Sequence, residues 1–244
     1  METLSTLGPG PIGSCESPDV SSILSSARAS RPTVESEGAS IDVVLFDLGN
    51  VLLAFDHGIA CRNLATLLGT DAETIRREVF ASGLEDRYER GEFDTAGFHR
   101  WLCERFSASP SIDQVRRAAS DIFTMRCDTV SILAQLKGAG IRTGVLSNTC
   151  EAHWSFVTDG RYRFLRDLVD HVVLSYEVRS MKPEPEIYRA AIEMVGVPAE
   201  RIFFMDDRPE NVRGAIEVGI RAVPFVDGAT LAEELRRCGL KFNY

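Results

Sequence analysis

Ile41-Asp-Val-Val-Leu-Phe-Asp-Leu-Gly-Asn-Val-Leu-Leu53 is the stretch that decides the fold of this chain. It begins with an apolar, β-branched run, Val43 to Phe46, which has the length and composition of a buried strand. The run ends at Asp47, and a loop at residues 48–50 follows. Because open α/β sheets place their sites at the carboxyl ends of strands, Asp47 is a candidate functional residue. The alternative is an aspartate that only caps a turn.

The composition is that of a globular protein, with 244 residues, 44% of them hydrophobic and 26% charged. A net charge of −9 argues against a nucleic-acid partner but not against an anionic substrate, because a bound metal ion inverts the local field. No apolar run approaches the length of a membrane span, so no membrane partner is expected. The cysteines are scattered without a Cys-x-x-Cys pair, which favours a reducing compartment, and we predict a cytoplasmic location.

Residues 1–40 differ in kind from the rest, because they are rich in Ser, Gly and Pro and their apolar residues follow no period. We predict that this N-terminal tail is disordered. It lacks the basic start and apolar core of a secretory signal, and its acidic residues outnumber its arginines, which disfavours an organelle transit peptide.

Residues 57–126 are predicted to be helical, with little strand pattern. Apolar side chains recur at helical spacing in four segments, at residues 59–68, 71–80, 93–106 and 112–125. Four helices inserted after one strand indicate a helical cap domain laid on a sheet domain. Phe98, Trp101 and Phe106 are expected in the core of this cap. Residues 85–90 are expected to form a solvated face, in a part of the cap that could reach the cleft.

From residue 127 onward, strand and helix patterns alternate. Strands are predicted at residues 142–146, 171–175, 201–205 and 221–225, and helices at 130–137, 184–195, 211–218 and 229–238. This alternation predicts an α/β fold with a doubly wound parallel sheet, whose core domain comprises residues 41–56 and 127–244. Pro224 indicates that the last strand lies at an edge.

Polar side chains follow three of the predicted strands and precede one helix on the same side of the sheet: Asp47, Ser147, Asn148, Lys182, Asp206 and Asp207. A solvated loop edge could gather such groups by chance, but crowded carboxylates require a cation, and hard oxygen ligands select Mg²⁺. A carboxylate facing a metal-bound phosphate is an activated nucleophile, while lysine and serine can hold the phosphoryl oxygens. The set therefore predicts phosphoryl transfer through an aspartyl phosphate on Asp47.

Four segments, at residues 46–51, 146–149, 181–184 and 205–211, resemble in order the motifs of the haloacid dehalogenase-like hydrolases. The resemblance implies that Asp47 is the nucleophile and that Ser147, Asn148 and Lys182 bind the substrate. It also implies that Mg²⁺ is held by a set comprising Asp47, the carbonyl of Gly49, Asp206 and Asp207, with Asn211 behind them. Within the family, the motifs are similar to those of bacterial sugar-phosphate phosphatases and of the phosphatase domain of two-domain epoxide hydrolases.

Gly49 departs from the family pattern, because most family phosphatases carry an aspartate there that protonates the leaving group. General acid catalysis is worth about 10²–10⁴ in rate. Either another group donates the proton, such as Asp56 or a residue of the cap, or the substrate has a good leaving group, as glycosyl phosphates do. The dehalogenases of the family also lack this aspartate, but they need no metal.

We therefore predict a Mg²⁺-dependent phosphatase that hydrolyses small phosphate monoesters, among them sugar phosphates, and that is a monomer or homodimer. One alternative is a hydrolytic 2-haloacid dehalogenase. A second, from another class, is a catalytically weak protein that binds a phosphometabolite without turning it over.

Overall fold

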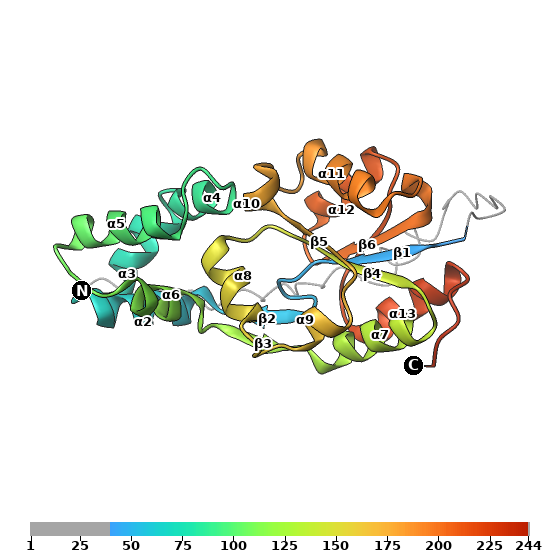
Figure 1. Cartoon of the computed structure of the whole chain (residues 1–244), viewed down its shortest axis with the longest axis horizontal. Coiled ribbons are helices and arrows are strands. Elements are labelled where there is room, and N and C mark those ends of the chain that lie inside the picture. The colour runs from blue at the N-terminus through green and yellow to red at the C-terminus, as the bar shows by residue number, and fades with distance from the viewer. Residues whose placement is uncertain (1–39, 244) are drawn as a thin grey trace, which may run out of the picture. The chain divides into compact units, whose positions relative to one another are not determined.

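The computed structural model describes residues 40–243, so the predicted disorder of the N-terminal tail falls almost wholly outside the described residues. Five parallel strands form the central sheet, in the order β5 (His171–Leu174), β4 (Arg142–Ser147), β1 (Val43–Phe46), β6 (Ile202–Asp206) and β7 (Arg221–Pro224). The opening strand is thus at the centre (Figure 1), and the order of the strands places the one that contains Pro224 at an edge, as predicted.

Helices cover both faces of the sheet: α7 (Cys127–Gly138) and α13 (Gly228–Arg237) on one, and α11 (Pro185–Val195) and α12 (Pro209–Glu217) on the other. Successive side chains of β1 point to opposite faces. Val44 and Phe46 pack with the first helix pair, and Val43 and Leu45 pack with the second. All four side chains are fully buried, which explains why β1 is continuously apolar. The predicted doubly wound α/β fold is confirmed.

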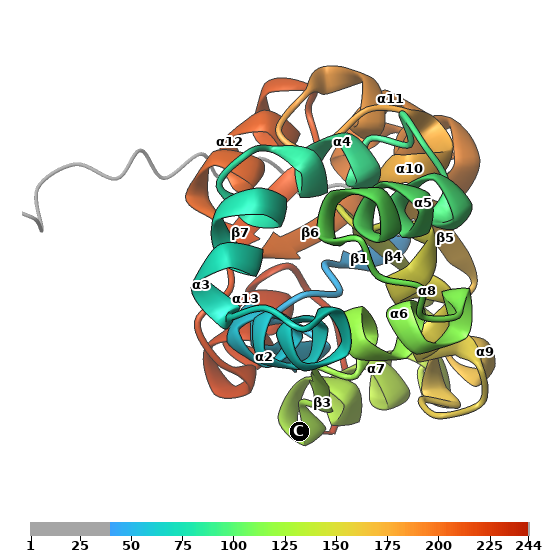
Figure 2. The same cartoon turned by 90° about the vertical axis from the view of Figure 1, so that its left-hand side faces the viewer.

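A helical insert lies between β2 (Leu53–Phe55) and β3 (Phe123–Met125). It comprises α2 (His57–Leu68), α3 (Ala72–Ile75), η1 (Arg76–Phe80), α4 (Leu84–Glu89), α5 (Thr95–Phe106) and α6 (Ile112–Ser120). Phe98 is buried in the apolar core of the insert, and Trp101 and Phe106 pack against that core, as expected. Figure 2 looks onto these helices, with the strands of the sheet behind them.

Three details of the insert differ from prediction. The helix expected at residues 112–125 ends at Ser120, and residues 123–125 form β3, because an antiparallel pairing with β2 binds their main-chain groups. The helix expected at residues 71–80 is one α-helical turn followed by the π-helix η1. Residues 85–90 are not uniformly solvated, because α4 buries Tyr88.

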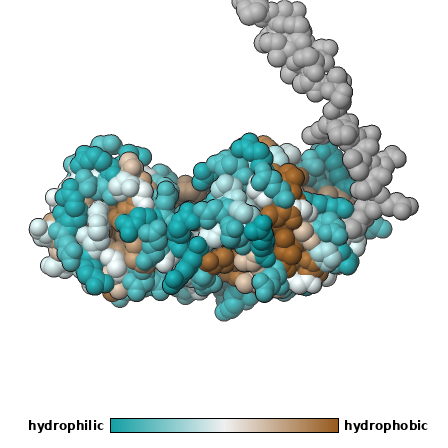
Figure 3. All heavy atoms as spheres, turned by 90° about the horizontal axis from the view of Figure 1, so that it is seen from above, coloured by the Kyte–Doolittle hydropathy of each residue, from teal (hydrophilic) through white to brown (hydrophobic). Residues whose placement is uncertain are grey.

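The remaining short helices are α8 (Glu151–Thr158), α9 (Phe164–Asp167), α10 (Ser175–Val178) and η2 (Ala199–Arg201). Hydrophilic residues cover most of the face seen in Figure 3, with apolar residues exposed between them. Among residues 40–243, none of the helices combines the length and the apolar composition needed to cross a bilayer.

Candidate active site

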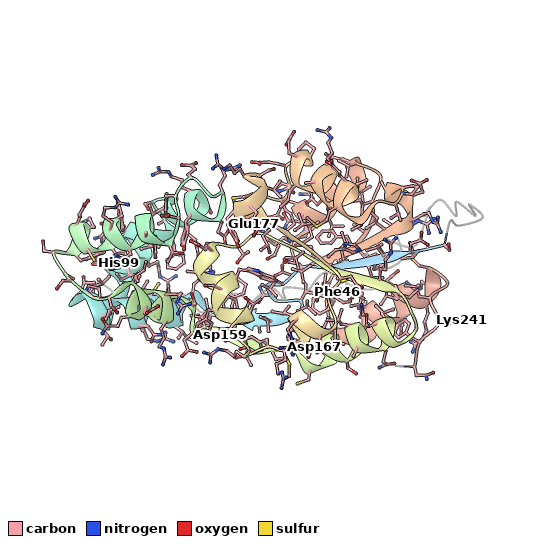
Figure 4. The ribbon with its side chains drawn as sticks, viewed as in Figure 1. Phe46, His99, Asp159, Asp167, Glu177 and Lys241 are labelled. Carbon is pink, nitrogen blue, oxygen red and sulfur yellow. The ribbon has the colours of Figure 1, made fainter. Side chains whose placement is uncertain are left out.

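Asp47 directly follows β1, in the interior position that the label of Phe46 marks in Figure 4. The strand register aligns Phe46 with Met205, so Asp47 and Asp206 leave neighbouring strands at the same edge of the sheet. The main-chain N–H of Asp47 donates to the carbonyl of Met205 at 3.0 Å. The N–H of Leu48 donates to Asp47 Oδ1 at 2.7 Å. These bonds hold the carboxylate in a buried position.

Lys182 joins two of the carboxylates. Its Nζ lies 2.8 Å from Asp47 Oδ1 and 2.6 Å from Asp206 Oδ2, and it also donates to the carbonyl of Leu146 at 2.9 Å. The ammonium group and both carboxylates are almost completely buried. Asn211 Nδ2 donates to both oxygens of Asp206 at 3.0 Å, so the position of Asp206 is set from two sides.

The buried cluster shifts the pKa values of Asp47 and Lys182. Burial raises the pKa of Asp47 to about 7, and the nearby negative charge of Asp206 adds to this rise, although Lys182 opposes it. Burial alone would lower the pKa of Lys182, but the two carboxylates keep it above its ordinary value. Lys182 therefore stays charged. The surroundings of Asp47 disfavour the ionised form of its carboxyl group. A bound cation would reverse that preference.

Asp207 completes a group of three carboxylates. One oxygen from each of Asp47, Asp206 and Asp207 lies within 4.8 Å of the others. Asp207 also accepts a hydrogen bond from Asn50 Nδ2 at 2.8 Å, which ties the loop after β1 to the loop after β6. Three anionic oxygens with one nearby ammonium group suit a hard divalent cation. The predicted metal contact of the Gly49 carbonyl stays a prediction.

Ser147 and Asn148, at the end of β4, were expected to bind the substrate. Ser147 is buried and lines the cavity described below. The Asn148 side chain exchanges two hydrogen bonds with the main chain of Lys182, at 2.9 Å to its carbonyl and 2.8 Å from its N–H. These two hydrogen bonds position Lys182. Because they occupy the Asn148 side chain, contact between Asn148 and a substrate would have to involve its main-chain N–H.

A small cavity of about 40 Å³ opens beside these residues. Core and insert both contribute to its lining: Leu48, Gly49, Phe55, His57, Glu89, Ile122, Phe123, Ser147, Asn148, Thr149 and His153. The sequence did not single out Glu89 or His57, although residues 85–90 were expected to lie in a part of the cap that could reach the cleft. A weak pattern was available for Glu89, because Leu84 and Tyr88 form a buried stripe and Glu89 follows Tyr88 directly on the same helix.

Asp56, which the sequence offered as a possible proton donor, can now be placed. Asp56 caps α2, where its Oδ1 accepts from the N–H of Gly58 at 2.7 Å, and its side chain is 60% exposed. Its carboxylate is thus engaged in capping the helix, and it is not among the residues that line the cavity. His153 lines the cavity, whereas its neighbour Trp154 packs against the core.

Residues 41–219 match the haloacid dehalogenase-like hydrolases, and the chain belongs to this family. It is similar to the phosphatase MT3486 of Mycobacterium tuberculosis, with 29% identity over 192 residues, covering 75% of this chain and 86% of the relative. It is also similar to D-ribitol-5-phosphate phosphatase of Bacteroides thetaiotaomicron, with 24% identity over 200 residues and coverage of 79% and 95%. Haloacid dehalogenases are among its further relatives.

A solved structure of the family enzyme bt-2542 of Bacteroides thetaiotaomicron, in complex with magnesium and inorganic phosphate, superposes with a TM-score of 0.70. The two share 27% identity, and the match covers 78% of this chain and 96% of the other. The predicted hydrolase class and fold are thus confirmed.

Proposed function

We propose that this protein is a Mg²⁺-dependent phosphatase that hydrolyses small phosphate monoesters through an aspartyl phosphate on Asp47. The observation that carries the proposal is the buried cluster of Asp47, Lys182 and Asp206, with Asp207 near enough to share a cation, beside a small cavity. The similarity to two named phosphatases and to a structure that contains magnesium and phosphate supports it.

The chain's own residues perform the transfer in two steps. An Asp47 oxygen attacks phosphorus while the bond to the leaving oxygen breaks, and water then attacks the aspartyl phosphate and releases inorganic phosphate. Lys182 already contacts Asp47 Oδ1, so its charge lies where the phosphoryl oxygens must come. Ser147 and Asn148 line the neighbouring cavity. The Ser147 hydroxyl, which donates to the carbonyl of Asn148 at 3.2 Å in this structure, would turn to donate to those oxygens together with the N–H of Asn148.

The three carboxylates fit a magnesium ion by their donor chemistry and mutual distance. Asp47, Asp206 and Asp207 would hold it, and the Gly49 carbonyl is proposed as a further ligand. When bound, the ion supplies positive charge that offsets the repulsion among the carboxylates and binds phosphoryl oxygens.

The cavity is small. About 40 Å³ holds only a few water molecules, since one water needs about 10–15 Å³ of such space. It suits a phosphoryl group, with the rest of the ester lying outside this volume. We favour small phosphate monoesters, including sugar phosphates, because the chain is similar to a D-ribitol-5-phosphate phosphatase. We also propose that residues 57–126 act as a cap over a core of residues 41–56 and 127–244.

We propose a cytoplasmic location for the protein. Five cysteines within the described residues are free, which suits the predicted reducing, cytoplasmic location. We propose that the protein is a monomer or homodimer, and light scattering is the measurement that tests this.

The test is release of inorganic phosphate from a panel of small phosphate esters, with and without Mg²⁺, by the wild type and by Asp47→Asn. We expect Mg²⁺-dependent turnover that Asp47→Asn abolishes, because an amide cannot form the acyl phosphate. Metal-independent release of halide from 2-haloacids would instead support the dehalogenase. Binding of inorganic phosphate without turnover of any ester would support the phosphometabolite-binding protein.

A further inference from the structure

The cavity contains three side chains that could exchange protons with a leaving group: Glu89, His57 and His153. Burial lowers the pKa of His153 to about 4, and burial also lowers the pKa of His57. Both imidazoles are therefore neutral near pH 7, and a neutral imidazole N–H is a very weak acid. Glu89 is the carboxyl group that remains.

The Glu89 carboxylate is free to act. Within residues 40–243, no hydrogen bond or ion pair reaches its side-chain oxygens, although it lines the same cavity as Gly49 and Ser147. A desolvated carboxyl group without a partner is costly to keep ionised. Its place beside a phosphoryl-binding cluster therefore calls for a functional explanation.

Contacts with the core hold this part of α4 in place. The main-chain carbonyl of Glu89 accepts a hydrogen bond from Ser175 Oγ at 2.6 Å. The next residue, Arg90, donates to Glu184 Oε2 at 2.8 Å, and Glu184 lies two residues after Lys182. The backbone that carries Glu89 is thus fastened to the segments that carry the phosphate-binding lysine. Such fastening keeps a catalytic side chain in one position.

We infer that Glu89 is the proton donor to the leaving group, taking the role for which Gly49 has no side chain. This inference rests on the proposed phosphatase function. In the first step, the carboxyl proton of Glu89 moves to the leaving oxygen as its bond to phosphorus breaks and the bond from Asp47 forms. In the second step, the Glu89 carboxylate accepts a proton from the attacking water as the bond between Asp47 and phosphorus breaks, which restores the carboxyl group.

The electrostatic surroundings agree with the geometry. Burial raises the pKa of Glu89 to about 7, so that the protonated form is available near neutral pH. The negative charges of Asp86 and Asp47 raise the pKa of Glu89 further, whereas the positive charges of Lys182 and Arg208 lower it. Glu85, one turn earlier on α4, is a further titratable neighbour, and the charge of Glu89 contributes to raising its pKa.

The experiment compares two leaving groups of similar size in a single turnover, with enzyme in excess and Mg²⁺ present. p-Nitrophenyl phosphate releases a stable anion that needs no proton, whereas benzyl phosphate releases an alkoxide that does. In Glu89→Gln, we expect release of benzyl alcohol to slow about 100-fold or more, within the range of general acid catalysis. Release of p-nitrophenol should change by less than about threefold, because that step needs no acid.

Two further variants complete the design. Glu92→Gln makes the same chemical change on an exposed side chain just after α4, which pairs with Arg87 and does not line the cavity. It should behave as the wild type with both esters. Glu89→Asp keeps the acid one methylene shorter and should recover part of the benzyl rate. Melting temperatures of all variants show whether the fold is kept.

The outcomes separate the inference from the function on which it rests. If the wild type releases neither leaving group, the proposed phosphatase function fails, and the inference fails with it. If the wild type releases both, but Glu89→Gln leaves both rates unchanged or slows both equally, the phosphatase stands and Glu89 is not the proton donor. Loss confined to benzyl phosphate supports the inference.

Discussion

The ring of Phe55 occupies the space that a side chain at Gly49 would need. A Cβ atom at Gly49 would lie 2.8 Å from Cε1 of Phe55, closer than real Cβ atoms approach their neighbours. The ring cannot easily turn away, because it packs against the rings of His57 and Phe123, at centroid distances of 4.8 and 6.2 Å. An aspartate at residue 49 would therefore require the Phe55 ring to shift. Under the proposed function, a proton donor to the leaving group would have to be another residue.

The first prediction follows from that contact. Gly49→Ala should lower the free energy of unfolding by about 1–3 kcal/mol, as overpacking does. In the Phe55→Leu background the same change should cost less, because the clashing ring edge is gone. Urea unfolding of the two single variants and the double variant measures the difference.

Gly138→Ala is the matched control, because no atom lies within 4 Å of a Cβ there. Equal costs of Gly49→Ala in both backgrounds would show that Phe55 is not the obstacle. For the same reason, Gly49→Asp is expected to destabilise the protein rather than to add a second proton donor.

The second prediction concerns the metal. Mg²⁺ should raise the melting temperature, because an ion that binds only the folded state stabilises it, by about 2.7 kcal/mol at 100 times its Kd. In Asp207→Asn most of this rise should disappear, since one of the three clustered carboxylates is lost. Asp113→Asn, on the exposed surface of α6, should keep the full rise. An identical rise in all three proteins would remove Asp207 from the metal site.

The third prediction concerns pH in the absence of metal. The folded protein keeps the Asp47 proton up to about pH 7, whereas an unfolded chain releases it near 3.8. Between these values the folded state binds more protons, so this group lowers the free energy of unfolding as pH rises. With chelator present, the melting temperature of Asp47→Asn should therefore rise relative to that of the wild type as the pH increases from about 4.5 to about 8. This range covers most of the interval between the unfolded and folded pKa values of Asp47. A constant difference would contradict the raised pKa.

The fourth prediction concerns the link between α4 and the core. Arg90→Ala removes the hydrogen bond to Glu184 and loosens the backbone beside Glu89. Because small displacements of a reacting group can cost up to about 100-fold, we expect benzyl phosphate turnover to fall about 3- to 30-fold. Arg87→Ala, on the same helix, loses an exposed pair with Glu92 and a cation–π contact with Phe93, neither of which joins α4 to the core, and should have a smaller effect. Equal losses in the two variants would show that the link does not position Glu89.

Much of the fold followed from local pattern. Continuous apolar runs such as Val43 to Phe46 identified buried strands, and their alternation with helices identified a parallel sheet. The pattern failed where pairing partners lie far away in the chain. Residues 123–125 continue a helical pattern, but they form a strand because β2, about seventy residues earlier, binds their backbone.

By itself, the sequence determined the parallel sheet and the polar ends of its strands, because a strand's apolar run and the residue that ends it are local features. Tertiary structure alone decided how those ends combine. It directed the Asn148 side chain to the backbone of Lys182, and it brought Glu89 to the cavity through contacts with Ser175 and Glu184, which lie 86 and 94 residues from their partners. The direction of a side chain in the helical insert depends on such distant contacts, and local periodicity does not encode them.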